Sequence, residues 1–324
     1  MIKVGIIGYG NLGKGVDIAV AKAVDTECVG VFTRRNPNSV KTLSGVPVFS
    51  VASLKDFKGK VDVMINCGGS ATDLPETTAK ILKDFNTVDS FDTHAKIPEY
   101  FNKLDKIAKE NKTLGAISIG WDPGLFSIAR LLFNSALPDG KDYTFWGKGV
   151  SQGHSDAIRR IKGVKNAIQY TIPKEDALTA VRNGTNPELT TRDKHLRECF
   201  VVAEENADRA EIEREIKQMP NYFADYDTVV HFISEEELKE NHGKLAHGGF
   251  VLRSGKTSEG VSHLLELSLK LDSNPQFTGS VLTAYARAVA KMSKEGKTGA
   301  ITVFDVPIKY LSEKPYEQLI ASLL

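Results

Sequence analysis

A glycine-rich turn near the N-terminus, set between a strand pattern and a helix pattern, constrains the fold more than any other feature of this chain. The apolar run Ile2 to Ile7 leads into Gly-Tyr-Gly-Asn-Leu-Gly at positions 8 to 13. Helically spaced apolar residues follow from Val16 to Val24, and a second apolar run occupies Cys28 to Phe32. Strand, turn, helix and strand fit the length of one βαβ unit, which predicts an α/β fold.

The spacing of the three glycines gives each one a physical role. Gly8 permits the tight turn, Gly10 lets the backbone approach a pyrophosphate, and Gly13 lets the helix pack close to the strand. Phosphates would bind the free N–H groups and the positive dipole end of the helix. A plain tight turn is the alternative, but the strand before it and the helix after it favour a dinucleotide site. The predicted contacts are Gly8, Tyr9, Gly10, Asn11, Leu12 and Gly13.

The end of the second strand predicts which dinucleotide binds. NAD sites usually place an acid there, which accepts a hydrogen bond from the ribose 2′-hydroxyl. This chain has Thr33, Arg34 and Arg35 instead. Two guanidiniums and a hydroxyl suit a 2′-phosphate, because arginine donates charge-assisted hydrogen bonds in a bidentate geometry. Two arginines alone would fit a solvated basic turn equally well, but their position at this strand end predicts NADP(H).

Strands and helices alternate up to about residue 120, which predicts a Rossmann-type, doubly wound parallel sheet. The expected strands are 46–49, 61–67, 87–91 and 113–119, and the expected helices are 75–85 and 98–110. Ligands bind such sheets at the carboxyl ends of the strands, so residues that follow strands should rim one cleft. Those expected at the cofactor are Cys67, Gly68, Gly69 and Ser70, and those expected beside it are Asp92, Trp121 and Asp122.

Asp92 and Asp122 are candidate catalytic residues, and each also has a structural interpretation. They are 122 − 92 = 30 positions apart but would be neighbours at the sheet edge. Asp122 fits the N-cap of a helix with Pro123 at its first position, and Asp92 fits a strand-end cap. Helix caps and ligand carboxylates share these positions, so spacing alone leaves both interpretations open.

The pattern changes after residue 122 and predicts a second α+β domain with an open mixed sheet. A strand at 143–146 precedes a glycine-rich turn at 147–155 and a helix from Asp156, and His263 is predicted to be a core residue. Further strands are expected at 168–172, 198–203, 228–233, 249–253 and 261–271, and helices at 125–137, 205–217 and 275–294. The expected domains are 1–122 and 123–297, with 298–324 packing back on the first.

Composition and spacing argue against several function classes. Lys plus Arg number 42 and Asp plus Glu number 41, so the net charge of +1 indicates neither a nucleic-acid nor a membrane partner. The three cysteines form no CxxC pair, and the seven histidines form no HxxxH pair, so no metal site is expected. No segment approaches the ~20 apolar residues of a membrane span. We expect a soluble, cytoplasmic protein whose chemistry is that of its cofactor.

Several stretches together resemble the meso-diaminopimelate D-dehydrogenase family. They are GYGNLG (8–13), TRR (33–35), GSATD (69–73), GWDPG (120–124), TFWGKGVSQGHSDAIRRI (144–161) and AHGG (246–249). The resemblance implies NADP-dependent, reversible oxidative deamination of the D-centre of meso-2,6-diaminopimelate, in lysine and cell-wall biosynthesis. The product, L-2-amino-6-oxopimelate, cyclises to tetrahydrodipicolinate. A homodimer is also implied, with a second region that binds substrate and mediates dimerisation.

The resemblance further implies which residues bind the substrate. Asp92 and Asp122 would hold the ammonium of the D-centre between two tryptophan walls, and we hypothesise that one of them relays its proton. The backbone of a Gln–Gly pair would bind the near carboxylate, whereas Thr, Arg and His side chains would bind the far carboxylate and Asn the far amine. Position 152 is Gln where some family members carry Met. The implied residues are Asp92, Trp121, Asp122, Trp146, Gln152, Gly153, Thr171, Arg197, His247 and Asn274.

Two other functions are compatible with the dinucleotide unit. Another NADP-dependent reductase of lysine or threonine biosynthesis, such as a dihydrodipicolinate reductase, would share the cofactor site. An NADPH-sensing regulator would instead present a basic or apolar partner surface and no polar pocket facing the nicotinamide. Asp92, Asp122 and Arg197 offer opposite charges to the two ends of an extended zwitterion, which favours the enzyme.

Overall fold

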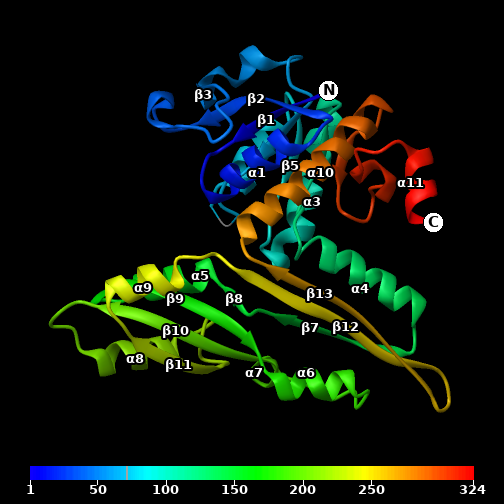
Figure 1. The fold of residues 1–324 in the computed structure, drawn as a ribbon. Coiled ribbons are helices and arrows are strands. Elements are labelled where there is room, and N and C mark those ends of the chain that lie inside the picture. The colour runs from blue at the N-terminus through cyan, green and yellow to red at the C-terminus, as the bar shows by residue number, and fades with distance from the viewer. Residues whose placement is uncertain (71) are drawn as a thin grey trace. The chain divides into compact units, whose positions relative to one another are not determined.

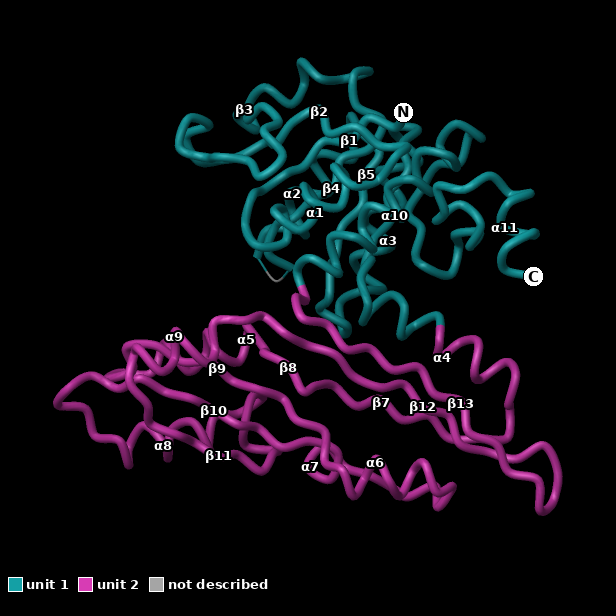
Figure 2. The backbone as a smooth tube through the Cα atoms, viewed as in Figure 1, with its two compact units in different colours: residues 1–128, 275–324 teal, residues 129–274 magenta. Residues whose placement is uncertain are grey.

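The computed structural model describes residues 1–70 and 72–324, and its backbone forms two compact units (Figures 1 and 2). Unit 1 contains residues 1–128 and 275–324, and unit 2 contains residues 129–274. The chain leaves unit 1 once and returns to it. Ala71, which belongs to the GSATD stretch, lies outside the described residues.

Unit 1 is built on a seven-stranded sheet whose strands all run parallel to their neighbours. Its order, β3-β2-β1-β4-β5-β6-β14, contains the 3-2-1-4-5-6 order of doubly wound dinucleotide-binding sheets and one further strand. The predicted parallel α/β class is therefore confirmed. The strands are β1 (Ile2–Ile7), β2 (Thr26–Thr33), β3 (Val48–Ser50), β4 (Val63–Asn66), β5 (Asn86–Asp89), β6 (Leu114–Ala116) and β14 (Gly299–Ile301).

Both faces of this sheet are covered, as the near-continuous apolar strands require. On one face Val4 and Ile6 of β1 pack in a cluster with Val20 and Tyr285, while Ile7 packs in a second cluster on the other face. The helices of unit 1 are α1 (Asn11–Lys22), α2 (Leu74–Ile81), α3 (Ile97–Asn111), α10 (Asn274–Lys294) and α11 (Tyr316–Leu323). Short 3-10 turns occupy Pro37–Ser39, Val51–Phe57, His94–Lys96 and Ile308–Leu311.

The long helix α10 lies in unit 1 from Pro275 onward, although the sequence pattern placed it in the second domain. Leu282, Tyr285 and Val289 are buried in the same core as the β1 side chains. The first crossing between units lies at residues 128 and 129, within a few residues of the expected boundary. A change of pattern marks where the chain leaves a domain, but it carries no signal for the point at which the chain returns.

Unit 2 contains two sheets where one open mixed sheet was expected. The four-stranded sheet, β11-β10-β9-β8, is mixed, because β10 pairs parallel with β11 and antiparallel with β9. The three-stranded sheet, β13-β12-β7, is antiparallel. The strands are β7 (Gly140–Trp146), β8 (Gly149–Val150), β9 (Val164–Pro173), β10 (His195–Ala203), β11 (Asp227–Phe232), β12 (His247–Ser258) and β13 (Val261–Leu271).

The helices of unit 2 differ in two respects from the expected ones. The helix expected from Asp156 begins four residues earlier, at Gln152, so half of the glycine-rich turn is helical. Three short, polar helices, α6, α7 and α9, had no expected counterpart. The helices are α4 (Leu125–Ala136, which begins in unit 1), α5 (Gln152–Arg159), α6 (Glu175–Arg182), α7 (Thr191–Lys194), α8 (Arg209–Gln218) and α9 (Glu235–His242).

The prediction that His263 is a core residue is wrong. Its side chain is exposed, and its Nε2 atom lies 2.8 Å from the Thr257 hydroxyl near the tip of the β12–β13 hairpin. β7 pairs with β12 only between Gly249 and Gly255, so the hairpin extends beyond the third strand. The alternation along β13 is real, but no described element covers this end of the strand.

The ion pair between Arg287 of α10 and Asp25 generates a stability prediction. Nε and Nη2 donate to the two carboxylate oxygens at 2.6 and 2.8 Å, and Arg287 is buried. Burial alone would raise the pKa of Asp25, but the hydrogen bonds and charge of Arg287 outweigh it and hold the pKa below its ordinary value. Asp25→Asn should lower the free energy of unfolding by about 3 kcal/mol at neutral pH in urea titrations, because the buried guanidinium is left with only the Glu313 carboxylate, 3.9 Å away, as a counter-charge.

The pH dependence of this loss follows from the sign of the shift. A depressed carboxyl pKa stabilises the fold above the ordinary value, and that stabilisation disappears as the pH falls through the folded value. The difference in unfolding free energy between wild type and Asp25→Asn should therefore become smaller below about pH 4. Glu76→Gln is the control, since the Glu76–Lys103 pair is exposed and should contribute less than about 1 kcal/mol. A difference in unfolding free energy that does not change with pH would contradict this account.

Candidate functional site

The glycine turn between β1 and α1 has the geometry of an anion cradle. Gly8 has φ +86°, a conformation that favours glycine, and a Cβ added at Gly13 would lie 2.2 Å from the Gly8 carbonyl oxygen. A Cβ added at Gly10 would meet no described atom within 4 Å beyond its chain neighbours, so the space above the turn is open. Asn11 begins α1, whose first turn carries no carboxylate among these described residues. This geometry fits a dinucleotide pyrophosphate.

Tyr9 and Leu12 in the same turn contribute differently from the glycines. The Tyr9 side chain is buried, and its hydroxyl donates to the buried Asp17 carboxylate at 2.5 Å. Burial and this bond raise the pKa of Tyr9 to about 12. The backbone N–H groups of Leu43 and Ser44 also donate to Asp17, so Tyr9 ties the turn to the 43–44 loop. Leu12 is half-buried and packs against the core, whereas the buried Tyr9 leaves only its backbone to a cofactor.

The basic residues at the end of β2 lie next to this turn. Nη2 of Arg35 donates to the Tyr9 carbonyl at 2.8 Å, and the Arg35 N–H donates to the Thr33 hydroxyl at 3.1 Å. Nη1 of Arg34 donates to Asp73 at 2.9 Å, and this hydrogen bond holds the pKa of the Asp73 carboxyl below its ordinary value. The Arg34 side chain is 70% exposed. Arg35 is therefore anchored to the turn, whereas Arg34 is accessible to an external anion.

The loops that follow β4 and β5 meet at the same sheet edge. Gly68 and Gly69 follow β4 and Cys67, and a Cβ added at Gly8 would lie 3.5 Å from the Cys67 carbonyl oxygen. The N–H of Asp92 donates to the Ser70 hydroxyl at 2.9 Å, and Asp92 itself is exposed. The predicted cofactor loop and the loop of the first candidate carboxylate are thus joined.

The loop after β6 excludes one of the two interpretations of Asp122. Helix α4 begins at Leu125, and its first i→i−4 hydrogen bond runs from the N–H of Ile128 to the carbonyl of Gly124 at 3.0 Å. Asp122 is therefore not the N-cap, and Pro123 is not the first helical residue. The half-buried Asp122 lies in a tight turn beside Trp121, whose ring packs edge-on against Phe126 at 5.2 Å.

Unit 2 supplies the second set of predicted residues, which includes a buried arginine. Arg197 is 6% exposed, its Nη1 donates to the Thr171 hydroxyl, and its guanidinium lies 3.9 Å from the Tyr226 ring centroid. Across the described part of the chain, no carboxylate pairs with Arg197, and its Nε has no partner. Burying a guanidinium without a counter-charge is unfavourable, so this site is suited to an anionic ligand.

Trp146 is positioned by a histidine that the sequence analysis did not single out. Its backbone N–H donates to Nε2 of His195 at 2.9 Å, and the two rings stack at 5.5 Å with an interplanar angle of 21°. Burial, followed by the positive charges of Lys194 and Arg197, lowers the pKa of His195 to about 3. The imidazole is therefore neutral and able to accept. Only its position two residues before Arg197, on the same face of β10, could have indicated its role.

The N-terminus of α5 carries the predicted Gln152–Gly153 pair. A Cβ added at Gly153 would meet no described atom within 4 Å beyond its neighbours, so the backbone there is open. His154 follows, with Nδ1 2.7 Å from the Ser151 hydroxyl, and its ring packs edge-on against Tyr222 and Phe223. Burial, followed by the charge of Arg197, lowers the pKa of His154 to about 4. Open backbone N–H groups at a helix N-terminus suit a carboxylate.

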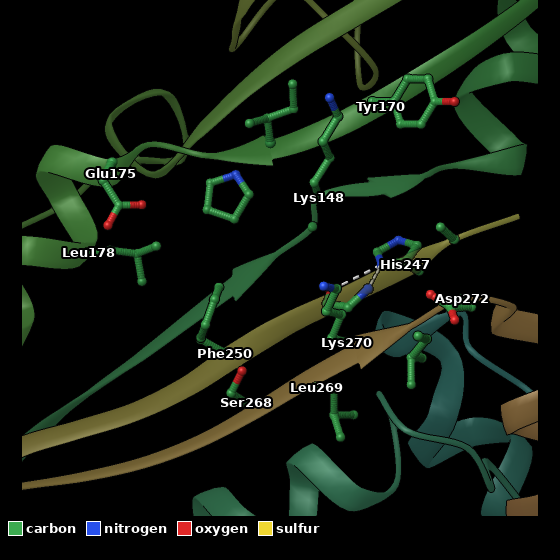
Figure 3. Close-up of a pocket in the computed structure, with 16 residues that line it drawn as sticks. Lys148, Tyr170, Glu175, Leu178, His247, Phe250, Ser268, Leu269, Lys270 and Asp272 are labelled. Carbon is green, nitrogen blue, oxygen red and sulfur yellow. Dashed lines mark hydrogen bonds between the residues drawn. The ribbon is translucent and has the colours of Figure 1, made fainter. Parts of the chain in front are cut away.

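Unit 2 contains a cavity of about 560 Å³, and His247 helps to line it (Figure 3). Tyr170 and Ile172 also line it, and they point to the face of β9 opposite the buried Thr171. The cavity is therefore not the space beside Thr171 and Arg197. Burial lowers the pKa of His247. It outweighs the opposing effect of the hydrogen bond between Nδ1 and the Gly248 carbonyl oxygen, which are 3.0 Å apart. Asn274 begins α10, and its N–H donates to the Leu245 carbonyl at 2.9 Å.

Metal clusters and membrane-spanning helices are both absent from the described residues. No group of three or more His, Cys, Asp or Glu side chains is placed to hold a metal ion. Among the described helices, none has both the length and the apolar character needed to cross a membrane.

Comparison with known proteins gives a consistent result. Residues 120–273 match the family model described as the diaminopimelic acid dehydrogenase C-terminal domain. The chain is 59% identical to the meso-diaminopimelate D-dehydrogenase of Ureibacillus thermosphaericus, covering 100% of this chain and 99% of that protein. The structure of C. glutamicum DAP dehydrogenase in complex with DAP has a TM-score of 0.93 and 44% identity, covering 100% and 99%. An engineered D-amino acid dehydrogenase bound to NADP⁺ has a TM-score of 0.88 and 42% identity, with the same coverage.

The buried, neutral state of His195 generates a prediction about pH. An unfolded histidine titrates near 6.5, so below that pH the unfolded chain binds a proton that folded His195 does not, and stability falls. His195→Gln can keep a hydrogen-bond acceptor for Trp146 and removes this titration. The loss of unfolding free energy between pH 7 and pH 5, measured in urea, should be about 2 kcal/mol smaller than in wild type. His263→Gln, at an exposed position, is the control and should keep the wild-type dependence; an unchanged slope in His195→Gln would contradict the assignment.

Proposed function

Because the chain belongs to the meso-diaminopimelate D-dehydrogenase family, we propose that it catalyses the NADP-dependent, reversible oxidative deamination of meso-2,6-diaminopimelate at the D-centre. The products are L-2-amino-6-oxopimelate, which cyclises to tetrahydrodipicolinate, and ammonia, on the route to lysine and the cell wall. The observation in this chain that carries the proposal is buried Arg197 without a described carboxylate partner. A substrate with a second carboxylate would supply that partner.

The cofactor proposal is supported by the turn and by the end of β2. When bound, the cofactor would supply the hydride acceptor for the α-carbon. The backbone from Gly8 to Gly13 would bind its pyrophosphate, and Cys67 to Ser70 would line its other side. Arg34 would release Asp73 and bind the 2′-phosphate instead. The Arg34 side chain is largely exposed, so this change needs little rearrangement. Arg35 and Thr33 would complete the anion site from fixed positions.

The substrate proposal assigns one role to each group of residues. Asp92 and Asp122 would hold the ammonium of the D-centre, walled by Trp121 and by Trp146 on its His195 support. The N–H groups at the start of α5, Gln152 and Gly153, would bind the near carboxylate. The remaining residues would bind the distal L-centre: Thr171, Arg197 and His247 the carboxylate, and Asn274 the amine.

The same carboxylates would serve the chemistry. Hydride leaves the α-carbon as the nitrogen lone pair forms an iminium, so the ammonium must first lose a proton. One carboxylate of the Asp92–Asp122 pair would take that proton, directly or through water, and then orient the water that attacks the iminium. Two carboxylates facing one ammonium disfavour double ionisation, which suits one of them to accept a proton.

Assembly and location follow from the same proposal. A second copy of the chain would cover the exposed apolar side chains of unit 2, which include Leu131 and Leu132 on α4 and Leu264 on β13, at 51%, 60% and 40% exposure. A homodimer through unit 2 is therefore proposed. Cys28, Cys67 and Cys199 are unpaired thiols, which is consistent with a reducing, cytoplasmic location.

The activity is tested by NADPH formation on adding diaminopimelate isomers with NADP⁺. The meso isomer should be oxidised, whereas the L,L isomer lacks a D-centre and should give no NADPH above background. The reverse reaction, with tetrahydrodipicolinate, ammonia and NADPH, should consume NADPH. Equal rates with both isomers, or no reaction with the meso isomer in either direction, would exclude the proposed function.

The cofactor assignment is tested with Arg34→Ala and with the Arg34→Ala, Arg35→Ala double variant. Each lost charge-assisted hydrogen bond should cost NADP⁺ binding roughly 1.5–3 kcal/mol. Fluorescence titration should show that Arg34→Ala weakens NADP⁺ and spares NAD⁺, because Arg34 has no bond to the turn. The double variant also loses the bond from Arg35 to Tyr9 and should weaken both cofactors. Exposed Arg214→Ala is the control; an equal loss of both cofactors in Arg34→Ala would mean that Arg34 is structural.

The substrate assignment is tested with Arg197→Met. Leaving a buried carboxylate unpaired costs about 2–5 kcal/mol, so kcat/KM for meso-diaminopimelate should fall by a corresponding factor. D-norleucine has no distal carboxylate, so its kcat/KM should hardly change. A parallel fall for both substrates would indicate a folding defect and would remove Arg197 from the binding site.

A further inference from the structure

A buried carboxylate at the end of β5 lies beneath the loops that carry the proposed catalytic residues. Asp89 is fully buried and accepts four hydrogen bonds. Oδ2 accepts from the hydroxyls of Tyr100 and Thr78 at 2.5 and 3.0 Å. Oδ1 accepts from the backbone N–H groups of Phe91 and Ser118 at 3.1 and 3.3 Å. Oδ2 thus accepts two hydrogen bonds from helix side chains, and Oδ1 accepts two from loop backbone.

The chemistry of this position is unusual for a purely structural residue. Over the described ranges, no cation pairs with Asp89, and burial raises its pKa although all four donors oppose that effect. A buried carboxylate without a cation is unfavourable unless hydrogen bonds compensate it, and here four donors do so. Such groups concentrate at functional sites.

The two backbone donors belong to the loops with the candidate catalytic residues. Phe91 directly precedes Asp92. Ser118 begins the segment that leads to Asp122, and it has φ +57°, a conformation uncommon for residues other than glycine. The main chain of Asp89 adds a third bond, since its carbonyl accepts from the Ile119 N–H at 2.9 Å. One residue of β5 therefore fixes the starting points of both loops.

The hydroxyl donors extend this network to the predicted cofactor loop. Thr78 donates to Asp89 and accepts from Nδ2 of Asn66 at 3.0 Å. Oδ1 of Asn66 accepts from the N–H of Gly68 at 3.3 Å. The buried chain of bonds Gly68–Asn66–Thr78–Asp89 thus connects the loops after β4, β5 and β6. Three strand ends are held by one hydrogen-bonded network of buried side chains.

We propose that Asp89 is a positioning residue, which sets the separation of Asp92 and Asp122 by anchoring the backbone of both loops on a single carboxylate. Its role in catalysis rests on the proposed function, whereas the anchoring itself does not. Asp89 does not contact the substrate. It acts through Phe91 and Ser118, whose N–H groups lose their acceptor if the carboxylate is removed.

The first test is Asp89→Ala compared with Asp89→Asn. Alanine removes the anchor, so KM for meso-diaminopimelate should rise and kcat/KM should fall about 100-fold, the scale of a small misplacement. NADPH affinity should change less than about threefold, because no charge-assisted bond to the cofactor is lost. Asparagine can keep Oδ1 on both N–H groups while the hydroxyls rotate to accept from its amide, so it should restore most of the activity. Asp105→Ala is the control: Asp105 also accepts a backbone N–H, that of Ala300 in β14 at 3.1 Å, and its loss should leave KM unchanged.

The second test separates anchoring from activity. Amide hydrogen exchange at Phe91 and Ser118, measured with NADPH bound, should be slow in wild type and Asp89→Asn and fast in Asp89→Ala. If the alanine variant does not fold, Asp89→Ser, whose hydroxyl is too short to reach both N–H groups, takes its place. Normal KM and kcat per folded enzyme in Asp89→Ala, or unchanged exchange, would overturn the proposal. Inactive wild type with the predicted exchange pattern would instead overturn the proposed function and leave the anchoring intact.

Discussion

The parallel hydrogen bonding of the seven strands in unit 1 is the constraint on which the rest of this unit depends. Parallel strands place all their carboxyl ends at one edge, so residues far apart in sequence meet there without any specific attraction between them. The glycine turn, the two arginines, the Ser70 loop and the Asp92 loop all follow such ends. The local contacts, such as Arg35 to Tyr9 and Asp92 to Ser70, refine an arrangement that the strand direction already imposes.

Two buried charges, one in each unit, represent opposite solutions to the same problem. Arg197 has a hydroxyl and an aromatic face but no described carboxylate, so its charge is left for a ligand to neutralise. Asp89 has no described cation, but four donors satisfy both oxygens within the fold. An incompletely satisfied charge is suited to binding, and a fully satisfied one is suited to holding backbone in place.

The sequence predicted the parallel sheet well, because apolar runs, glycine turns and helical spacing are local signals that the βαβ unit repeats. The positions of Arg34, Arg35 and Asp92 followed from strand ends and needed no tertiary information. Sequence patterns failed to predict features that depend on contacts between residues far apart in the chain. His195 supports Trp146 from 49 positions away, and the core packing of α10 depends on strands at the other end of the chain. His263 follows the alternation of its strand, but no element among the described residues covers it, and periodicity cannot reveal this.

The return of the chain to unit 1 has a consequence for synthesis on the ribosome. The sheet face that contains Val4 and Ile6 is completed by α10, which is made only after all of unit 2. Unit 2 spans residues 129–274. At a synthesis rate of about 5–20 residues per second, this apolar face therefore stays without α10 for on the order of ten seconds or more. During that interval the nascent chain presents an unfinished parallel sheet, whose edge at β6 also lacks β14. Unit 2 is translated without interruption and can fold first, so the order of folding is expected to be the reverse of the order in which the two units begin.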